Sequence, residues 1–197
     1  MDIVQRNTRY VPFTQQASCC VPTSIQMIMY RNDIPLIPAE ELGYYLGLTV
    51  SPENKHLFYN PRTSDEPPST AGYGTQIFVP EFKPNKVFEK LGIPLSFEII
   101  SANSLNNEKN LMDQLKDIEA QNLDALLCFN HGVIIGEYKP HSGHVAVFDR
   151  IIDNEIQLVD ASSKQPKWRL VQPSLMFEAI KKHGLQNSAG IWIFEKI

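Results

Sequence analysis

Three residues of the chain have the types needed for nucleophilic catalysis: Cys20, His144 and Asp160. A cysteine attacks a carbonyl carbon when a nearby histidine takes its proton and a third group orients that histidine. The chemistry open to such a set is acyl transfer through a thioester. Whether these residues can meet depends on the elements that carry them.

Pro22 selects between the two adjacent thiols. A proline lacks the amide hydrogen, so it is tolerated only within the first turn of a helix. The apolar residues around it predict a helix over 20–30, with Cys20 in its first turn and Cys19 at or outside its start. Free amides and the helix dipole stabilise an anion there and favour a thiolate. We expect Cys20 to be the nucleophile, Cys19 a neighbour without a chemical role, and Cys128 a core residue.

His144 opens two strand-like runs joined by a polar turn, HVAVFDRIIDNEIQLVD. A three-residue hairpin loop at 152–154 would pair Ile151 with Glu155. Asp160 would then lie on the same face as His144, one diagonal step away, where a carboxylate can reach an imidazole. A two-residue loop would instead place Asp160 on the opposite face of the hairpin from His144. On the three-residue loop, Asp160 is the expected orienter of His144.

The other four histidines are weaker candidates for the base. His141 and His131 are reserves, and the sequence NHG places His131 in a turn. His56 and His183 lie in polar surroundings without evident partners. Cysteine and histidine never occur at paired metal-ligand spacing, since the adjacent cysteines lack the gap of a zinc motif. We expect no metal and no cofactor.

The elements that would position these residues segregate along the chain. Helices are predicted over 20–30, 39–48, 84–91, 108–120 and 175–182, and strands over 95–100, 125–129, 144–151, 155–160 and 190–195. Helices dominate the first half and strands the second. This order favours an α+β fold over alternating βαβ units.

A proline-rich stretch, SPENKHLFYNPRTSDEPPSTAGYG, interrupts this pattern over 51–74. Its prolines and glycines disfavour both helix and strand. A connection of this length is often a lid or a substrate-binding loop, and it is equally compatible with a plain surface insertion. Both interpretations stay open.

Composition narrows the class of protein. The chain has 197 residues, 43% of them hydrophobic and 20% charged, which is typical of a soluble globular domain. The net charge of −4 lacks the excess of positive charge that is typical of nucleic-acid-binding domains. Two small basic clusters are expected to be solvated: Lys164, Lys167 and Arg169, and Lys181, Lys182 and His183.

Location is predicted from what the sequence lacks. No apolar run approaches the length of about 18 residues expected of a membrane span. The first residues lack the apolar segment of a secretory signal, and three cysteines do not form a disulfide framework. We expect a cytoplasmic protein in a reducing compartment, with leaderless secretion left open and the oligomeric state not indicated.

The order of these residues resembles the papain-like cysteine peptidases, most closely the C39-like (bacteriocin-leader) peptidases and their relatives, which include phytochelatin synthase. CVPTSIQM, over 20–27, is similar to the family's Cys-Gly-Pro-Ala-Ser-Leu motif, with Val21 and Thr23 in place of small residues. GHVAVFDRIIDNEIQLVDA, over 143–161, resembles the family's Gly-His strand, its turn, and a strand that ends in aspartate.

The resemblance implies one bacterial papain-like domain over 1–197, in which a helical part carrying Cys20 packs on an antiparallel sheet carrying His144. It also implies an oxyanion-hole glutamine, which in the family usually lies six residues before the cysteine. That position is Thr14 here, so we expect Gln15 to serve, with Gln16 as the alternative.

The expected function is a cysteine peptidase-like hydrolase that cleaves a peptide or isopeptide bond of a peptide or protein substrate. The same Cys20-His144-Asp160 triad would also serve an acyl or peptidyl transferase or a deamidase. A domain of this shape can also bind a peptide without cutting it. The thiol at the helix start favours the enzyme over the binding module.

Overall fold

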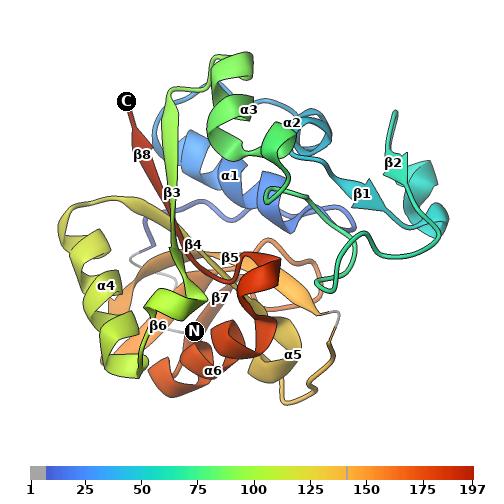
Figure 1. Cartoon of the computed structure of the whole chain (residues 1–197). Coiled ribbons are helices and arrows are strands. Elements are labelled where there is room, and N and C mark those ends of the chain that lie inside the picture. The colour runs from blue at the N-terminus through green and yellow to red at the C-terminus, as the bar shows by residue number, and fades with distance from the viewer. Residues whose placement is uncertain (1–7, 141) are drawn as a thin grey trace.

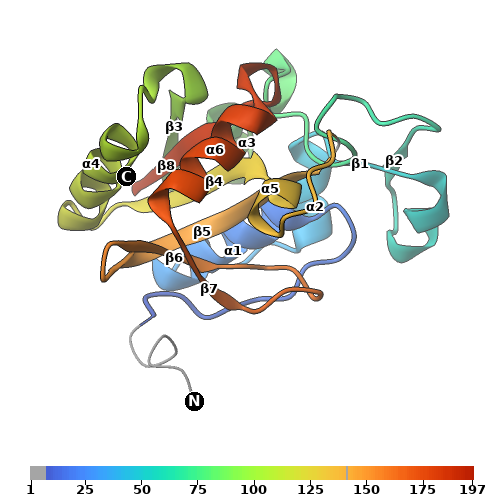
Figure 2. The same cartoon turned by 90° about the horizontal axis from the view of Figure 1, so that it is seen from below.

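The computed structural model describes residues 8–140 and 142–197, and it is built around a six-stranded antiparallel sheet with helices on both faces (Figures 1 and 2). The order across the sheet is β3-β8-β4-β5-β6-β7. The strands are β3 Leu95–Ser101, β4 Asp124–Asn130, β5 Gly143–Ile152, β6 Glu155–Val159, β7 Trp168–Val171 and β8 Gly190–Lys196. The expected α+β fold class is confirmed.

The helices divide between the two faces of this sheet (Figure 2). One face carries α1 Cys20–Arg31 and α3 Pro84–Leu91, with α2 Ala39–Tyr45 packed against α1. The opposite face carries α4 Glu108–Ala120, α6 Pro173–His183 and the short α5 His131–Ile134. Cores on both faces explain why all seven residues of β4 are buried.

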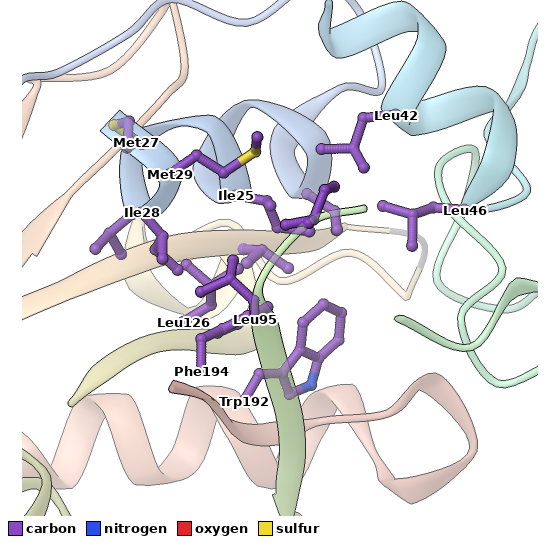
Figure 3. Packing of buried hydrophobic residues seen from close by; sticks show 14 of the residues in the cluster. Ile25, Met27, Ile28, Met29, Leu42, Leu46, Leu95, Leu126, Trp192 and Phe194 are labelled. Atoms are coloured by element: carbon purple, nitrogen blue, oxygen red, sulfur yellow. The ribbon is translucent and has the colours of Figure 1, made fainter. Parts of the chain in front are cut away.

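The central helix is α1, whose side chains are buried almost throughout its length. Its first residue is Cys20 and its N-cap is Cys19, so Pro22 occupies the third helical position, as expected. Figure 3 shows Ile25 and Met29 of α1 above Leu126 and Phe194 of the sheet. The helix therefore holds its first turn in a fixed place relative to the sheet.

A buried carboxylate fixes the other end of α1. Asp124 accepts hydrogen bonds from the Tyr10 hydroxyl at 2.5 Å, from Arg31 Nη1 at 2.5 Å and from Asn32 Nδ2 at 2.7 Å. Burial, together with the charge of Asp124, raises the pKa of Tyr10 well above its ordinary value. These contacts tie the end of α1 to the first residue of β4.

The hairpin of β5 and β6 has a different turn from the expected one. Only Asp153 and Asn154 connect the strands, and both have positive φ, 49° and 65°, as a two-residue type I′ turn requires. Ile152 pairs with Glu155, so the prediction of a three-residue loop is wrong.

A β-bulge at Asp149 compensates for the shorter turn. The register shifts by one residue between Phe148 and Arg150, and beyond the shift Phe148 pairs with Leu158. The carboxylate of Asp149 is buried and accepts hydrogen bonds from the backbone of Arg9 at 2.8 Å and from the Gln157 side chain at 3.0 Å. The bulge restores, at the open end of the hairpin, the pairing that the three-residue loop would have given.

The remaining elements are short. They are β1 Thr49–Val50, β2 Arg62–Thr63 and the 3₁₀ helices Pro52–Leu57, Pro80–Phe82, Ala102–Ser104 and Leu185–Asn187. The proline-rich stretch thus contains one 3₁₀ helix and one two-residue strand, which the sequence did not predict. Within the described residues, no helix has the combined length and hydropathy to cross a bilayer.

Candidate active site

The two adjacent thiols have different surroundings. Cys19 is 0% exposed beside Leu48, Val50 and Phe58, and burial raises the pKa of its thiol to about 12. Cys20 is only partly buried and lines a pocket at the start of α1. This contrast agrees with Cys20 as the candidate nucleophile and Cys19 as a core neighbour.

His144 and Asp160 are joined across the hairpin. Nε2 of His144 lies 2.8 Å from Oδ1 of Asp160, and the carboxylate also accepts a hydrogen bond from the backbone N–H of Ser162 at 2.8 Å. Asp160 is 2% exposed, so this pair is shielded from water. Because Asp160 occupies Nε2, Nδ1 is the ring nitrogen left for the Cys20 sulfur.

The charges of this group favour an imidazolium. Burial lowers the pKa of His144, but hydrogen bonding with Asp160 and Cys20 and the charges of both outweigh it and raise the pKa to about 10. Burial raises the pKa of Asp160, and the hydrogen bond and charge of His144 reverse this and hold it below its ordinary value. An imidazolium beside a thiol stabilises the thiolate.

His131 is part of this site, although its sequence context predicted only a turn. Its ring packs edge-on against His144, and Phe129 packs on His144 in the same manner. Burial, followed by the charge of His144, lowers the pKa of His131 to about 4, so this ring is neutral at pH 7. Two neighbouring histidines thus hold opposite protonation states.

The expectation that His183 lies in polar surroundings is wrong. Its side chain is 4% exposed at the end of α6 and lines the same pocket as Cys20 and His144. Burial lowers the pKa of His183 to about 4. The apolar spacing of α6 could have suggested this position, because His183 follows Met176, Ala179 and Ile180 on the buried stripe. His56 is exposed, and His141 lies outside the described residues.

Gln15 and Gln16 also differ in burial. Gln16 is exposed, whereas Gln15 is partly buried and its backbone N–H donates to the Ala161 carbonyl at 2.9 Å. The side-chain oxygen of Gln15 is buried and has no hydrogen-bond partner among residues 8–140 and 142–197. Gln15 therefore lies beside the segment that follows Asp160.

The last part of the proline-rich stretch borders the pocket. Ala71 and Gly72 line it together with Gly143 and His144, and the Gly143 N–H donates to the Ala71 carbonyl at 3.1 Å. The pocket is mainly apolar, with Val145 and Trp192 among its walls, and its volume is about 50 Å³. The end of the proline-rich stretch therefore forms part of the pocket wall.

The pocket is also narrow. A β-carbon at position 143 would lie 2.8 Å from Cε1 of His183 and 2.9 Å from the Ala71 carbonyl oxygen. Only glycine fits there without displacing a neighbour. Across the described part of the chain, no three side chains of the metal-binding types gather closely enough to hold a metal ion.

Known proteins resemble this chain in three-dimensional fold rather than in sequence. No protein-family model and no curated protein matches the sequence. Among solved structures, a protein from Bacillus anthracis assigned to the C39-like peptidases superposes with a TM-score of 0.58 at 13% identity, over 95% of each chain. A double glycine motif protease from an AMS/PCAT transporter, solved with its leader peptide, gives a TM-score of 0.51 at 11% identity, over 98% of this chain and 97% of the other. The chain therefore has the fold of the C39-like peptidases.

Proposed function

We propose that the protein is a cysteine peptidase-like hydrolase that cleaves a peptide or isopeptide bond. Cys20 is the nucleophile, His144 the general acid and base, and Asp160 the group that orients His144. The observation that carries the proposal is the His144 imidazole, held by Asp160 at 2.8 Å and turned toward Cys20 with a pKa of about 10. A neutral His131 against the same ring adds no competing positive charge.

In the acylation step, the Cys20 thiolate attacks the carbonyl carbon of the scissile bond and a carbon–sulfur bond forms. The electron pair of the C=O bond moves to oxygen. When the tetrahedral intermediate collapses, the carbon–nitrogen bond breaks and the His144 imidazolium gives its proton to the leaving amine. A thioester and a neutral imidazole remain.

In the deacylation step, the neutral His144 takes a proton from water, and the resulting hydroxide attacks the thioester. The carbon–sulfur bond breaks, and the acid product leaves together with the regenerated thiolate–imidazolium pair. Asp160 stabilises the imidazolium in both steps without itself being protonated.

We assign two donors to the developing oxyanion. The first N–H groups of a helix have no carbonyl partner within that helix, so the Cys20 N–H is directed outward at the start of α1. The Gln15 side-chain N–H is assigned as the second donor, in preference to Gln16, because Gln15 is partly buried and Gln16 is exposed. Loss of one such donor slows comparable enzymes by about 100- to 1,000-fold.

A peptide is the substrate that the site supports best. The pocket beside Cys20 is narrow and mostly apolar, which suits one short side chain of an extended chain. The double glycine motif protease was solved with its leader peptide, and it aligns with this chain over nearly its full length. We extend this peptide-binding role to the present protein as part of the proposal.

The first test is selective alkylation. Iodoacetamide at about pH 6, followed by peptide mapping, should modify Cys20 at least about 10-fold faster than Cys19 or Cys128, because Cys20 lines the pocket beside the His144 imidazolium while burial raises the pKa of the other two thiols. A matched Cys128→Ala variant should keep this reactivity, and His144→Ala should lose it. Equal and slow labelling of all three thiols would refute the activated nucleophile.

The second test identifies the reaction. A peptide library digested in heavy-oxygen water is compared between the wild type and Cys20→Ala. Hydrolysis predicts new carboxyl termini that carry heavy oxygen and are absent with the variant. Products joined to another amine would indicate a transferase, and loss of ammonia from a side-chain amide would indicate a deamidase. Peptide binding without any product would favour the binding module.

A further inference from the structure

We propose that Lys167 is a positioning residue, which holds the segment carrying Gln15 and the segment following Asp160 in one fixed arrangement. This inference rests on the proposed function, because it assigns Lys167 to the same acyl-transfer site. Lys167 touches neither the thiol nor the imidazole. It acts through the two segments that flank them.

The Lys167 ammonium donates to three backbone carbonyls. Its Nζ lies 3.1 Å from the Phe13 oxygen, 3.1 Å from the Ala161 oxygen and 3.0 Å from the Ser162 oxygen. An ammonium has three N–H donors, so all of them can be satisfied here. Phe13 precedes Gln15 by two residues, and Ala161 and Ser162 directly follow Asp160. One side chain therefore joins parts of the chain that are far apart in sequence.

The same carbonyl links both segments a second time. The Ala161 oxygen accepts the Gln15 N–H at 2.9 Å as well as the Lys167 ammonium. The Asp160 N–H donates to the Lys167 carbonyl at 2.9 Å, so the backbone of Lys167 is fixed against Asp160 too. Together these bonds form a closed network that joins the segment carrying Gln15, the segment following Asp160, and Lys167.

The environment of Lys167 differs from that of a solvated lysine. Its side chain is partly buried, and burial lowers the pKa of its ammonium, while the charge of Asp160 partly opposes this. Lys164, in the same predicted basic cluster, is exposed and its side chain has no hydrogen bond within the described residues. The expectation that this cluster is only solvated is therefore wrong for Lys167.

Gln15 lies outside any helix or strand, and its N–H is held by the Ala161 carbonyl, which the Lys167 ammonium also contacts. An oxyanion donor misplaced by about 1 Å can lose about 100-fold in rate. Without the ammonium, the Phe13 carbonyl loses its link to the segment after Asp160. The expected loss is therefore in stabilisation of the oxyanion, and much less in formation of the thiolate.

Two small probes separate these effects. p-Nitrophenyl acetate acylates Cys20: the thiolate attacks the ester carbon, an oxyanion forms, and p-nitrophenolate leaves. Iodoacetamide alkylates the same thiolate by displacing iodide, without an oxyanion. The ratio of the two rate constants therefore reports on the oxyanion donors, whatever the natural substrate is. A loss of global stability would not change this ratio in the folded fraction.

We expect Lys167→Met to lower the ratio by about 10- to 100-fold while the alkylation rate changes by less than about 3-fold. Gln15→Ala should lower the ratio similarly. The double variant should lose no more than Gln15→Ala alone, because the effect of Lys167 on the oxyanion is expected to pass through Gln15, while its bonds to the segment after Asp160 anchor that effect. Lys181→Met is the matched control: Lys181 also donates to a distant carbonyl, that of Ala102 at 2.6 Å, but away from the site, and its ratio should stay at the wild-type value.

An unchanged ratio in Lys167→Met would overturn the inference, as would an equal loss in both rates or additive losses with Gln15→Ala. If Lys167→Met does not fold, Lys167→Arg carries the same test, since it keeps a cation whose planar fork cannot match three converging carbonyls. A lowered ratio in Lys167→Arg supports the inference and an unchanged one overturns it. Failure of the proposed function would look different, because wild-type Cys20 would then react selectively with neither probe.

Discussion

The ring of His131 packs edge-on against the ring of His144, with centroids 5.2 Å apart and planes inclined by 71°. The two rings differ in charge at neutral pH, since the pKa of His131 is lowered to about 4 and that of His144 is raised to about 10. A second cation at 131 would repel the imidazolium, so this arrangement requires a neutral neighbour.

His131→Phe should therefore make the free energy of unfolding less dependent on pH below neutrality. The unfolded chain binds a proton at His131 below its ordinary pKa of 6.5, but the folded protein binds it only near 4. Stability is thus lost as pH falls from 6.5 toward 4, by an amount that solvent screening reduces because His131 is only partly buried. Phenylalanine removes this loss and keeps the packing. Urea unfolding at several pH values should show a smaller decline for the variant, and parallel curves would contradict it.

Asp160→Asn should lower the pKa of His144 by at least about one unit, because the negative charge that favours the imidazolium is gone. Titration of the His144 ring signals by NMR measures this directly. Asp153→Asn, in the hairpin turn, is the control and should leave the His144 titration in place. An unshifted titration in Asp160→Asn would mean that Asp160 does not stabilise the imidazolium.

The same shift predicts a loss of stability at alkaline pH. The folded pKa of His144, about 10, lies above its ordinary 6.5. The stabilisation is therefore fully present below pH 6.5 and is lost as pH rises toward 10. Thermal melting of the wild type and Asp160→Asn over this range should show a steeper alkaline decline in the wild type. Equal declines would count against a raised pKa.

Gly143→Ala should impair substrate binding more than nucleophile activation. The new methyl group would crowd His183 and the Ala71 carbonyl in a pocket of about 50 Å³. We expect KM for a cleaved peptide to rise about 10-fold or more, while alkylation of Cys20 by iodoacetamide changes less than about 3-fold. Loss of both together would show that the substitution disturbs His144 itself.

Asp124→Ala should destabilise the protein by about 3–5 kcal/mol, because it removes a buried acceptor shared by Tyr10, Arg31 and Asn32. Asp113→Ala is the matched control, since Asp113 forms an exposed ion pair with Lys109 and should contribute less than about 1 kcal/mol. Chemical denaturation measures both. Similar losses in the two variants would contradict the role of Asp124 in fixing α1.

The parts of the fold that could be predicted are those set by local patterns. Pro22 fixed the start of α1, and Gly92 ends α3 in the left-handed conformation that glycine favours. The edge strand β7, Trp168–Val171, follows a polar and proline-containing run and lacks a clear alternation, so it was not predicted.

The sequence predicts the position of Asp160 beside His144 correctly, but the argument behind that prediction is partly wrong. Asp160 lies beside His144 as expected, but the expected turn is one residue too long and the bulge at Asp149 was not foreseen. Asp149 in that bulge accepts hydrogen bonds from Arg9, which is distant in sequence, and from Gln157, which lies on the paired strand. The local sequence around Asp149 therefore does not predict the bulge. Similarly, only the tertiary structure brings Lys167 and His131 to the site.

The last strand along the chain, β8, lies inside the sheet between β3 and β4, and it is the only neighbour of β3 in the described structure. Ribosomes make the N-terminal residues first, so the residues of α1 are synthesised long before those of β8, which completes the sheet on which α1 packs. A nascent chain that lacks β8 therefore carries Cys20 before the sheet that supports His144 is complete. We expect Cys20 and His144 to be held in their final arrangement only after residues 190–196 have been synthesised and inserted between β3 and β4.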